Sequence, residues 1–424
     1  MKILVVGGGG REHAVIRKIK ENKSVTEVYA LPGNGGIARD AVCVNIKATD
    51  IDGIAGFAVK EGIDYAIVTP DDPLCLGAVD RLTAEGIPCF GPSASAAVIE
   101  GSKVFAKDLM KKYDIPTAEY RVFEDPADAL EYVAVCPVPT VIKADGLALG
   151  KGVIIANTRA EAAEAVKTIM EDKKFGKSGD MIVIEEFLTG PEVSVLAFTD
   201  GRTVVPMVSS MDHKRALDGD RGLNTGGMGT IAPNPYYTEA VAAECMEKIF
   251  LPTIDAMNRE GRTFKGCLYF GLMITPSGPK VIEYNCRFGD PETQVVLPLL
   301  KSDLLDIMKA CTAGYLADVP VVFDDRCAAC VILASEGYPE HYEKGFPITF
   351  PEEISGKLFA AGTALSDGKL VTSGGRVIAV TEIADTLEEA VARAYRTAEL
   401  VEFDNKYCRS DIGRKALAAL SGEK

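Results

Sequence analysis

The stretch Ile3-Leu4-Val5-Val6-Gly7-Gly8-Gly9-Gly10-Arg11-Glu12-His13 joins a short apolar run to a glycine-rich turn and then to an amphipathic segment. Four aliphatic residues bounded by glycine are typical of a buried strand. The strand, turn and helix follow in the order found in parallel α/β units. This stretch therefore predicts that the chain begins with a doubly wound parallel sheet.

The same alternation continues through the first hundred residues. Further buried strands are expected at 25–30, 65–68 and 87–90, and helices at 11–22, 50–61 and 73–85. Beyond them we expect strands at 138–143, 152–156, 181–185, 191–198, 264–274, 279–285 and 327–334, and helices at 102–113, 303–313 and 386–401. Residues 171–180 and 209–235 have no regular pattern and are interpreted as mobile loops.

Composition excludes several classes of protein. The 424 residues carry 46 basic and 61 acidic side chains, a formal charge of −15, which argues against nucleic-acid or anionic-membrane partners. No apolar run approaches the ~20 residues of a membrane helix, and the run after Lys2 is too short for a signal peptide. Eleven cysteines scattered singly indicate reduced thiols, and we expect a cytoplasmic protein.

The first glycine-rich loop is a candidate phosphate site, because exposed backbone N–H groups at a helix start bind anions. Arg11 is interpreted as a phosphate clamp, and Asn34 could join it from the next loop. A dinucleotide fingerprint needs glycine where Glu12 or His13 stands, so a nicotinamide cofactor is disfavoured. The alternative is a tight turn without a ligand.

A second glycine-rich segment runs from Lys143 to Gly152, with a further lysine at Lys151. A loop of this kind can cover a polyphosphate while lysines neutralise it. The alternative is a plain hairpin with solvated lysines. The acids that end the next strand, Glu185 and Glu186, resemble an adenine hinge, and Glu192 could accept hydrogen bonds from ribose hydroxyls.

The most informative polar pattern is Val281-Ile282-Glu283-Tyr284-Asn285-Cys286-Arg287-Phe288-Gly289-Asp290-Pro291-Glu292. Because side chains alternate along a strand, one face would carry Ile282, Tyr284, Cys286 and Phe288 toward the core. The other face would present Glu283, Asn285 and Arg287. Carboxylate and amide oxygens suit Mg²⁺, and the arginine suits a phosphate or carboxylate. The alternative is a half-exposed edge strand.

Two further patterns are weaker. Asp212-His213-Lys214-Arg215 and Asn224-Thr225-Gly226-Gly227-Met228-Gly229 share one long loop, which suits a substrate lid, although a solvated loop is the alternative. His213 has no visible orienting partner. Cys327 and Cys330 would face opposite sides of a strand, which favours a core strand over a zinc or redox site.

The chain resembles the phosphoribosylamine–glycine ligases, ATP-grasp enzymes of purine biosynthesis, from end to end. The motifs that carry the resemblance are Gly9–Ala14, Glu100–Lys103, Lys143–Gly152, Asp212–Arg215, Asn224–Gly229, Asn285–Gln294 and Thr372–Arg376. The resemblance implies a doubly wound domain over 1–101, an ATP-grasp domain over 102–318 with a nucleotide-covering subdomain at about 118–190, and a C-terminal domain over 319–424.

The resemblance also implies roles for individual residues. Lys103 and Lys143 would contact ATP phosphates and act with Arg287 as the catalytic residues, and Glu283 and Asn285 would bind Mg²⁺ or Mn²⁺. The remaining nucleotide contacts would be Gly150, Lys151, Glu185, Glu186, Phe187, Leu188 and Glu192. The substrate contacts would be Gly9, Gly10, Arg11, Glu12, Asn34, Asp212, Lys214, Gly289 and Asp290.

The implied reaction ligates glycine to 5-phosphoribosylamine through a glycyl phosphate, with release of ADP and phosphate. The expected partners are these small molecules, and the expected state is a monomer. Thr69, Asp71, Leu223 and Ala360 depart from residues usual in the family. The alternatives are an ATP-grasp ligase with another acid or amine, a non-catalytic nucleotide-binding protein and, third, a dehydrogenase.

Overall fold

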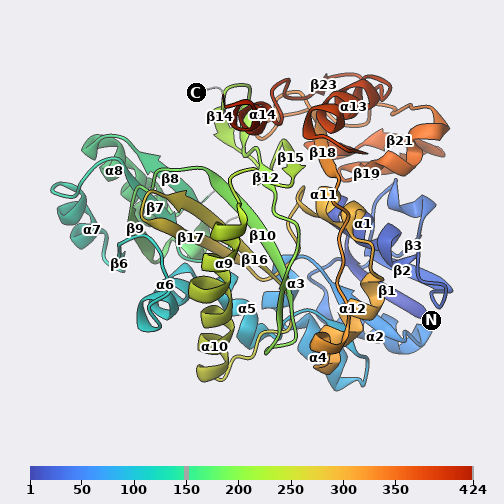
Figure 1. Ribbon diagram of the computed structural model, residues 1–424, viewed down its shortest axis with the longest axis horizontal. Coiled ribbons are helices and arrows are strands. Elements are labelled where there is room, and N and C mark those ends of the chain that lie inside the picture. The colour runs from blue at the N-terminus through green and yellow to red at the C-terminus, as the bar shows by residue number, and fades with distance from the viewer. Residues whose placement is uncertain (148–151, 423–424) are drawn as a thin grey trace.

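The computed structural model describes residues 1–147 and 152–422. Its N-terminal unit contains a parallel five-stranded sheet in the order β3-β2-β1-β4-β5, with β1 at the centre (Figure 1). The strands are β1 (Lys2–Gly7), β2 (Glu27–Pro32), β3 (Val42–Cys43), β4 (Tyr65–Val68) and β5 (Cys89–Phe90). The helices are α1 (Gly10–Ile19), α2 (Ile51–Glu61), α3 (Asp71–Cys75), α4 (Ala78–Ala84) and α5 (Ala94–Gly101). The predicted doubly wound sheet is confirmed.

The single helix predicted at 73–85 is wrong. The chain forms two short helices there, because Gly77 adopts a φ of 86° and interrupts the helical backbone. Glycine tolerates this left-handed conformation without a steric penalty. The break allows α4 to pack separately against α2.

Two antiparallel sheets follow. The first, in the order β6-β9-β7-β8, forms a small lobe with its own hydrophobic cluster, which includes Val133, Ile142 and Ile184. Its elements are β6 (Tyr120–Phe123), α7 (Pro126–Val133), β7 (Thr140–Ala144), β8 (Val153–Ala156), α8 (Arg159–Val166) and β9 (Ile182–Glu186). The preceding helix α6 (Lys103–Lys112) packs its buried apolar residues into the central core. The second, in the order β11-β10-β16-β17, belongs to the central body. Its elements are β10 (Glu192–Thr199), β11 (Val204–Pro206), α9 (Glu239–Cys245), α10 (Leu251–Arg259), β16 (Gly266–Thr275) and β17 (Gly278–Asn285).

A β-bulge in β17 changes the predicted alternation. Gly271 on β16 pairs with Glu283 and Leu272 pairs with Val281, so Ile282 is the extra residue. Before the bulge Val281 is buried, and after it Tyr284 is buried, three residues further on. The prediction that Ile282 lies on the core face is therefore wrong. Tyr284, Cys286 and Phe288 are buried as expected, whereas Glu283, Asn285 and Arg287 are only partly buried.

The C-terminal sheet includes strands from the middle of the chain. Its order is β12-β15-β18-β22-β19, with β23 beside β18. The strands are β12 (Met211–Asp212), β15 (Gly229–Ala232), β18 (Cys327–Ser335), β19 (Leu358–Ala360), β22 (Arg376–Ala384) and β23 (Lys406–Tyr407). Two hairpins, β13 (Arg215–Leu217) with β14 (Arg221–Asn224) and β20 (Thr363–Ser366) with β21 (Lys369–Thr372), accompany it. Helices α11 (Thr293–Val296), α12 (Leu304–Ala313), α13 (Leu387–Glu399) and α14 (Arg414–Ser421) complete the described elements.

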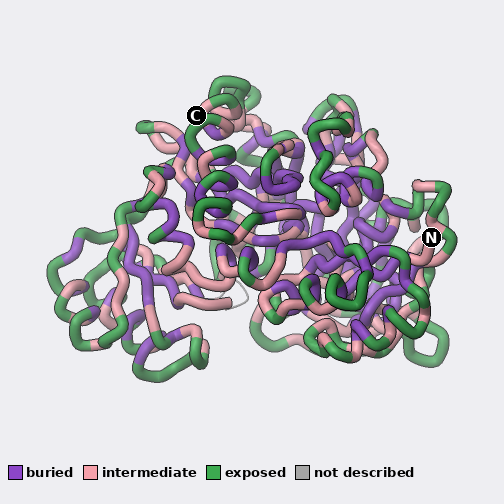
Figure 2. Tube along the Cα trace, turned by 90° about the horizontal axis from the view of Figure 1, so that it is seen from below, coloured by how far each residue is buried: buried purple, intermediate pink, exposed green. Residues whose placement is uncertain are grey.

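The prediction of an irregular loop at 209–235 is wrong, because β12 to β15 lie within it. The core strand predicted around Cys327 and Cys330 is confirmed, and all eleven cysteines are free. Buried residues concentrate along the sheets, with exposed loops at the periphery (Figure 2). Among the described helices, none has the length and apolarity that a membrane span requires.

Candidate functional site

Two lysines converge on one buried carboxylate between the small lobe and the central body. Lys143 on β7 lies 3.0 Å from Glu185 on β9, and Lys107 on α6 lies 3.1 Å from the other oxygen of that carboxylate. The Lys143 ammonium also donates to the carbonyl of Ile282 at 3.1 Å, which links the small sheet to the bulge in β17. Burial lowers the pKa of Lys107 to about 8. Glu185 therefore fixes the orientation of Lys143.

Lys107 was not among the residues selected from the sequence. Its signal is its spacing of four from Lys103, which places the two lysines on one face of α6. Lys103 donates to the carbonyl of Gly146 at 2.8 Å, and Asp145 accepts from the Val104 amide at 2.8 Å. The start of the glycine-rich segment is thus fixed to the N-terminus of α6. Gly150 and Lys151 lie outside the described residues.

The segment predicted to contact adenine begins at the end of β9. The Glu185 carbonyl accepts from the Thr140 hydroxyl at 2.8 Å, and the Glu186 carboxylate pairs with Lys280 at 3.0 Å. Phe187 is exposed, and Leu188 is partly buried. The two acids therefore differ, because Glu185 faces the lysines inside whereas Glu186 faces the surface. Adenine contact by this segment stays a prediction.

Lys214 joins two carboxylates of the predicted nucleotide site. Its ammonium lies 3.0 Å from Glu192 on β10 and 3.7 Å from Glu283 on β17. Although burial opposes the effect, the positive charges of Lys214, Lys143 and Lys103 lower the pKa of Glu283. Glu283 is therefore ionised at neutral pH, beside the cations predicted to contact phosphate.

Arg287 is held by a residue from the end of the N-terminal unit. Its guanidinium lies 3.2 Å from Glu100 on α5 and donates to the Asn285 side-chain oxygen at 3.0 Å. The second Glu100 oxygen accepts from the Cys286 amide at 2.7 Å. Glu100 lay in a quoted motif but had no assigned role, because sequence spacing does not reveal its partner at position 287.

The donor set at β17 fits a magnesium ion. Glu283 and Asn285 offer two hard oxygens on one face, and Mg²⁺ typically takes one or two protein ligands plus waters and substrate phosphates. In the part of the chain that the structure describes, no group of three His, Cys, Asp or Glu side chains has metal-binding geometry. A cation here would therefore depend on the nucleotide for its remaining ligands.

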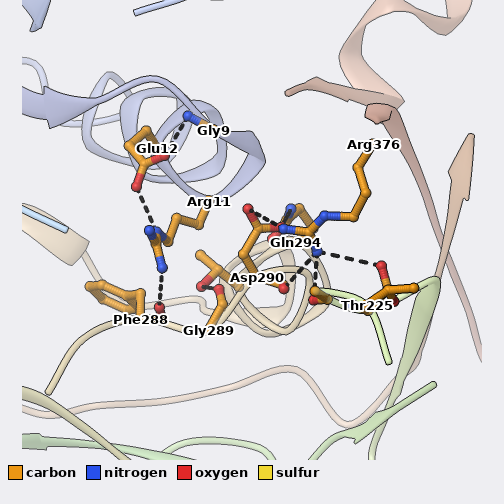
Figure 3. A network of polar contacts seen from close by, with 12 residues as sticks. Gly9, Arg11, Glu12, Thr225, Phe288, Gly289, Asp290, Gln294 and Arg376 are labelled. Carbon is orange, nitrogen blue, oxygen red and sulfur yellow. Dashed lines mark hydrogen bonds and ion pairs between the residues drawn. The ribbon is translucent and has the colours of Figure 1, made fainter. Parts of the chain in front are cut away.

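The first glycine-rich loop is closed by Glu12. The Glu12 carboxylate accepts from the Gly9 amide at 2.5 Å and from the Arg11 guanidinium at 2.6 Å (Figure 3). The hydroxyl of Thr69 lies 2.7 Å from the same carboxylate. A Cβ atom at Gly7, whose φ is 123°, would come within 2.6 Å of the Glu12 side chain. Glu12 thus organises the loop from the position where a dinucleotide fingerprint has glycine.

Asn34 connects this loop to the C-terminal part of the chain. Its amide nitrogen donates to the carbonyls of Gly8 at 2.9 Å and Ala360 at 2.8 Å. Its oxygen accepts from the amides of Gly36 and Ile37, both at 2.9 Å. The side chain is therefore engaged by protein at both ends, and phosphate contact by Asn34 stays a prediction.

His213 lies between Asp212 and Lys214, which are both predicted substrate residues, but its own ring contacts only protein backbone. Loss of hydration and the nearby Glu292 raise the pKa of Asp212, whose carboxylate accepts from the His213 amide at 2.7 Å. The His213 ring contacts the Gly229 carbonyl at 3.0 Å and accepts from the Gly413 amide at 3.1 Å. Burial lowers its pKa to about 4. Both ring nitrogens are engaged, so His213 has a structural role.

The residues that depart from the family pattern have different surroundings. Burial opposes ionisation of Asp71, but the charges of Arg287 and Arg11 lower its pKa, so Asp71 is an anion at neutral pH. Leu223 is half exposed on β14. Ala360 contributes backbone groups, and its amide donates to the His13 ring at 2.8 Å.

Gly289 and Asp290 lie where three parts of the chain meet. The Asp290 carboxylate accepts from the Gln294 side chain at 2.7 Å and pairs with Arg376 at 3.3 Å (Figure 3). Arg376 comes from β22 and lay in a quoted motif without an assigned role. The structure thus groups the predicted residues into two neighbouring sets, one around Lys143 and Glu283 and one around Arg11 and Asp290.

Comparisons with known proteins cover almost the whole chain. Models of the phosphoribosylglycinamide synthetase N domain, ATP-grasp (A) domain and C domain match residues 1–100, 101–293 and 328–415. A phosphoribosylamine–glycine ligase of Caldanaerobacter subterraneus subsp. tengcongensis is 48% identical over 413 residues, 97% of this chain and 99% of the relative.

Solved structures agree with the family models. The crystal structure of the phosphoribosylamine–glycine ligase of Thermotoga maritima is 38% identical, with a TM-score of 0.86, and the match covers 97% of this chain and 100% of that one. The biotin carboxylase of Campylobacter jejuni matches with a TM-score of 0.75 at 14% identity, covering 96% of this chain and 92% of that one. The second likeness concerns the fold alone.

Proposed function

This chain belongs to the phosphoribosylglycinamide synthetase family, and on that premise we propose that it ligates glycine to 5-phosphoribosylamine with ATP. The products are glycinamide ribonucleotide, ADP and phosphate, and the reaction is a step of purine biosynthesis. The enzyme is an ATP-grasp ligase. The observation that carries the assignment of roles is a set of polar groups gathered where the small lobe meets the central body: Lys103, Lys143, Lys214, Glu283, Asn285 and Arg287.

In the first step, a carboxylate oxygen of glycine attacks the γ-phosphorus of ATP, and ADP leaves. Lys143 and Lys103 bind the phosphates, and Arg287 neutralises charge on the group in transfer. Catalysis of this kind rests on positioning and charge neutralisation rather than on a nucleophilic side chain. The Glu185–Lys143 pair at 3.0 Å supports this role, because it holds a buried ammonium beside β17, which carries the proposed metal ligands.

Glu283 and Asn285 would hold a divalent cation, Mg²⁺ or Mn²⁺, together with phosphate oxygens. The cation supplies charge neutralisation at the transferring phosphoryl group. Lys214 lies between Glu192, the proposed ribose ligand, and Glu283. Lys214 would bind phosphate oxygens beside that cation.

In the second step, the amine of 5-phosphoribosylamine attacks the carbonyl carbon of glycyl phosphate. The C–N bond forms, phosphate leaves with the oxygen that came from glycine, and the amine loses a proton. Gly9, Gly10, Arg11 and Glu12 would bind the acceptor with Gly289 and Asp290, which the Arg11 contact with Phe288 at 3.2 Å supports. Asp212 and Lys214 would line the same substrate space, and Asn34 would join the phosphate loop.

The acyl phosphate would be lost if water reached it. We assign exclusion of water to the glycine-rich segment that follows Lys143, since its described start is fixed by Lys103 and Asp145. The adenine would lie against Glu185, Glu186, Phe187 and Leu188. Phosphate contact by Gly150 and Lys151 stays a prediction, because both residues lie outside the described ranges.

Two further properties belong to the proposal. We propose a monomer as the working unit. The eleven free cysteines support a reducing compartment, and hence the cytoplasm.

Isotope transfer tests this route. With glycine labelled by ¹⁸O in both carboxylate oxygens, we expect one labelled oxygen in each released phosphate, detected by mass spectrometry. Unlabelled glycine in ¹⁸O-water is the control and should give unlabelled phosphate. Phosphate released without label from labelled glycine would contradict the glycyl phosphate intermediate. Release that requires a different acid would favour the alternative, an ATP-grasp ligase with another substrate.

A further inference from the structure

One loop of the site is held by an arginine from each of the three matched domains. Arg11 from α1 and Arg287 from the end of β17 both donate to the carbonyl of Phe288, each at 3.2 Å. Arg376 from β22 donates to the carbonyl of Asp290 at 2.8 Å. The backbone of residues 288–290 is therefore fixed from three sides.

Arg376 makes the largest set of these contacts. Besides the Asp290 carbonyl, its guanidinium donates to the carbonyl of Gly226 at 2.7 Å and pairs with the Asp290 carboxylate at 3.3 Å. The side chains of Arg376 and Asp290 are 19% and 13% exposed. Although burial opposes it, the charge of Asp290 raises the pKa of Arg376, so the guanidinium stays charged. A guanidinium can satisfy several acceptors in fixed directions, which an ammonium cannot do.

The carboxylate that Arg376 holds faces the first glycine-rich loop. A Cβ atom at Gly9 would lie 3.3 Å from an Asp290 oxygen, and one at Gly10 would lie 2.4 Å from the Gln294 amide nitrogen. The same Gln294 nitrogen donates to Asp290 at 2.7 Å. Figure 3 shows Asp290 between Arg376 on one side and Arg11 on the other. Contact this close is possible because Gly9 and Gly10 have no side chains and because the orientation of Asp290 is fixed.

From these contacts we infer that Arg376 is a positioning residue for the amine substrate. It acts through Asp290 and through the backbone of Gly226 and residues 288–290, and it makes the C-terminal domain part of the acceptor site. Among the described residues, no hydrogen bond or ion pair joins Arg376 to the nucleotide set around Lys143 and Glu283. The inference rests on the proposed function, since it assumes that the acceptor binds between the glycine-rich loop and Asp290.

The test compares Arg376→Gln and Arg376→Lys with Arg326→Gln, which removes an exposed arginine that is paired with Asp324 and lies just before the matched C domain. Calorimetric ADP binding and thermal unfolding are measured beside steady-state kinetics. We expect Arg376→Gln to raise the KM for 5-phosphoribosylamine about ten- to a hundred-fold, because small misplacements of binding groups have effects of this size. ADP affinity should change less than about twofold. The KM of Arg376→Lys for 5-phosphoribosylamine should lie between those of the parent and Arg376→Gln. Arg326→Gln should have the KM and the ADP affinity of the parent.

The double variant Arg376→Gln/Asp290→Asn tests whether Arg376 acts through Asp290. We expect its KM for the amine to rise no more than that of the more impaired single variant, because interacting residues are non-additive. Fully multiplicative effects would overturn the inference, and so would an unchanged KM for the amine or an equal loss of ADP affinity in Arg376→Gln. Failure of the parent enzyme to require both glycine and the amine would instead overturn the proposed function.

Discussion

At the scale of single residues, the candidate site is organised by ion pairs between elements far apart in sequence. The alternation of Glu283, Asn285 and Arg287 could be predicted, because side-chain direction follows from strand geometry alone. Their long-range partners could not be predicted. Glu100 accepts from the Cys286 amide, 186 residues further along the chain. The contact of Arg376 with Asp290, 86 residues apart, was hidden for the same reason. Only the fold brings such pairs together.

The phosphate contact proposed for Lys143 can be tested by mutation. If Lys143 binds ATP phosphate, its replacement with alanine removes a charge-assisted contact worth roughly 1.5–3 kcal/mol, so kcat/KM for ATP should fall about ten- to a hundred-fold. Initial rates at varied ATP check this, with the exposed Lys60→Ala as the control. An unchanged kcat/KM for ATP would remove Lys143 from the nucleotide site.

At the scale of elements, the long apolar strands and amphipathic helices were predictable, and the short irregular ones were not. β12, β13, β14 and β15 have two to four residues each, too few for a period to be recognised. β15 pairs with β18, which follows almost a hundred residues later, and β12 joins the same sheet through β15. β13 and β14 pair with each other. The bulge in β17 was equally hidden, because one extra residue leaves no mark in composition.

The bulge in β17 can be tested by removing its extra residue. Deleting Ile282 would restore regular pairing, because Glu283 already lies opposite Gly271 and Val281 opposite Leu272, and it would leave Glu283 and Asn285 on one face. The deletion removes the Ile282 carbonyl, which accepts from the Lys143 ammonium at 3.1 Å. Because Lys143 loses a charge-assisted hydrogen bond, we expect kcat/KM for ATP to fall about tenfold in the deletion variant, and we expect nearly normal turnover from Ile282→Val. Full turnover by a folded deletion variant would show that the bulge is unimportant for the site.

At the scale of the whole molecule, the three matched domains are joined by polar contacts at the site itself. The doubly wound N-terminal part could be predicted because its strands and helices alternate locally. The merging of residues 211–232 into the C-terminal sheet could not, since it depends on long-range pairing. One consequence is that His213, next to two proposed substrate residues, accepts from the Gly413 amide near the C-terminal end of the chain.

This contact predicts a loss of stability in acid. His213 has an ordinary pKa of 6.5 in the unfolded chain and about 4 in the folded protein, because burial disfavours its charged form. As the pH falls below 6.5, the unfolded chain takes up a proton that the folded protein does not. The contribution of His213 to the free energy of unfolding is therefore fully present above its ordinary pKa of 6.5 and is reduced by about 3 kcal/mol as the pH approaches 4.

Chemical denaturation from pH 7 to pH 4 measures this effect in the parent and in His213→Gln. The variant should lose less stability over the same range, although His13, whose pKa burial also lowers, contributes in both proteins. Equal losses in parent and variant would show that protonation of His213 does not set the acid stability.

We propose that one site couples ATP cleavage to the joining of glycine and 5-phosphoribosylamine. The most direct measurement is the release of ADP and phosphate from Mg-ATP with glycine and freshly generated 5-phosphoribosylamine, omitting each component in turn. We expect sustained release only when all three substrates are present, with one ADP for each glycinamide ribonucleotide formed. Sustained release that ignores glycine, or that requires another acid in its place, would contradict it.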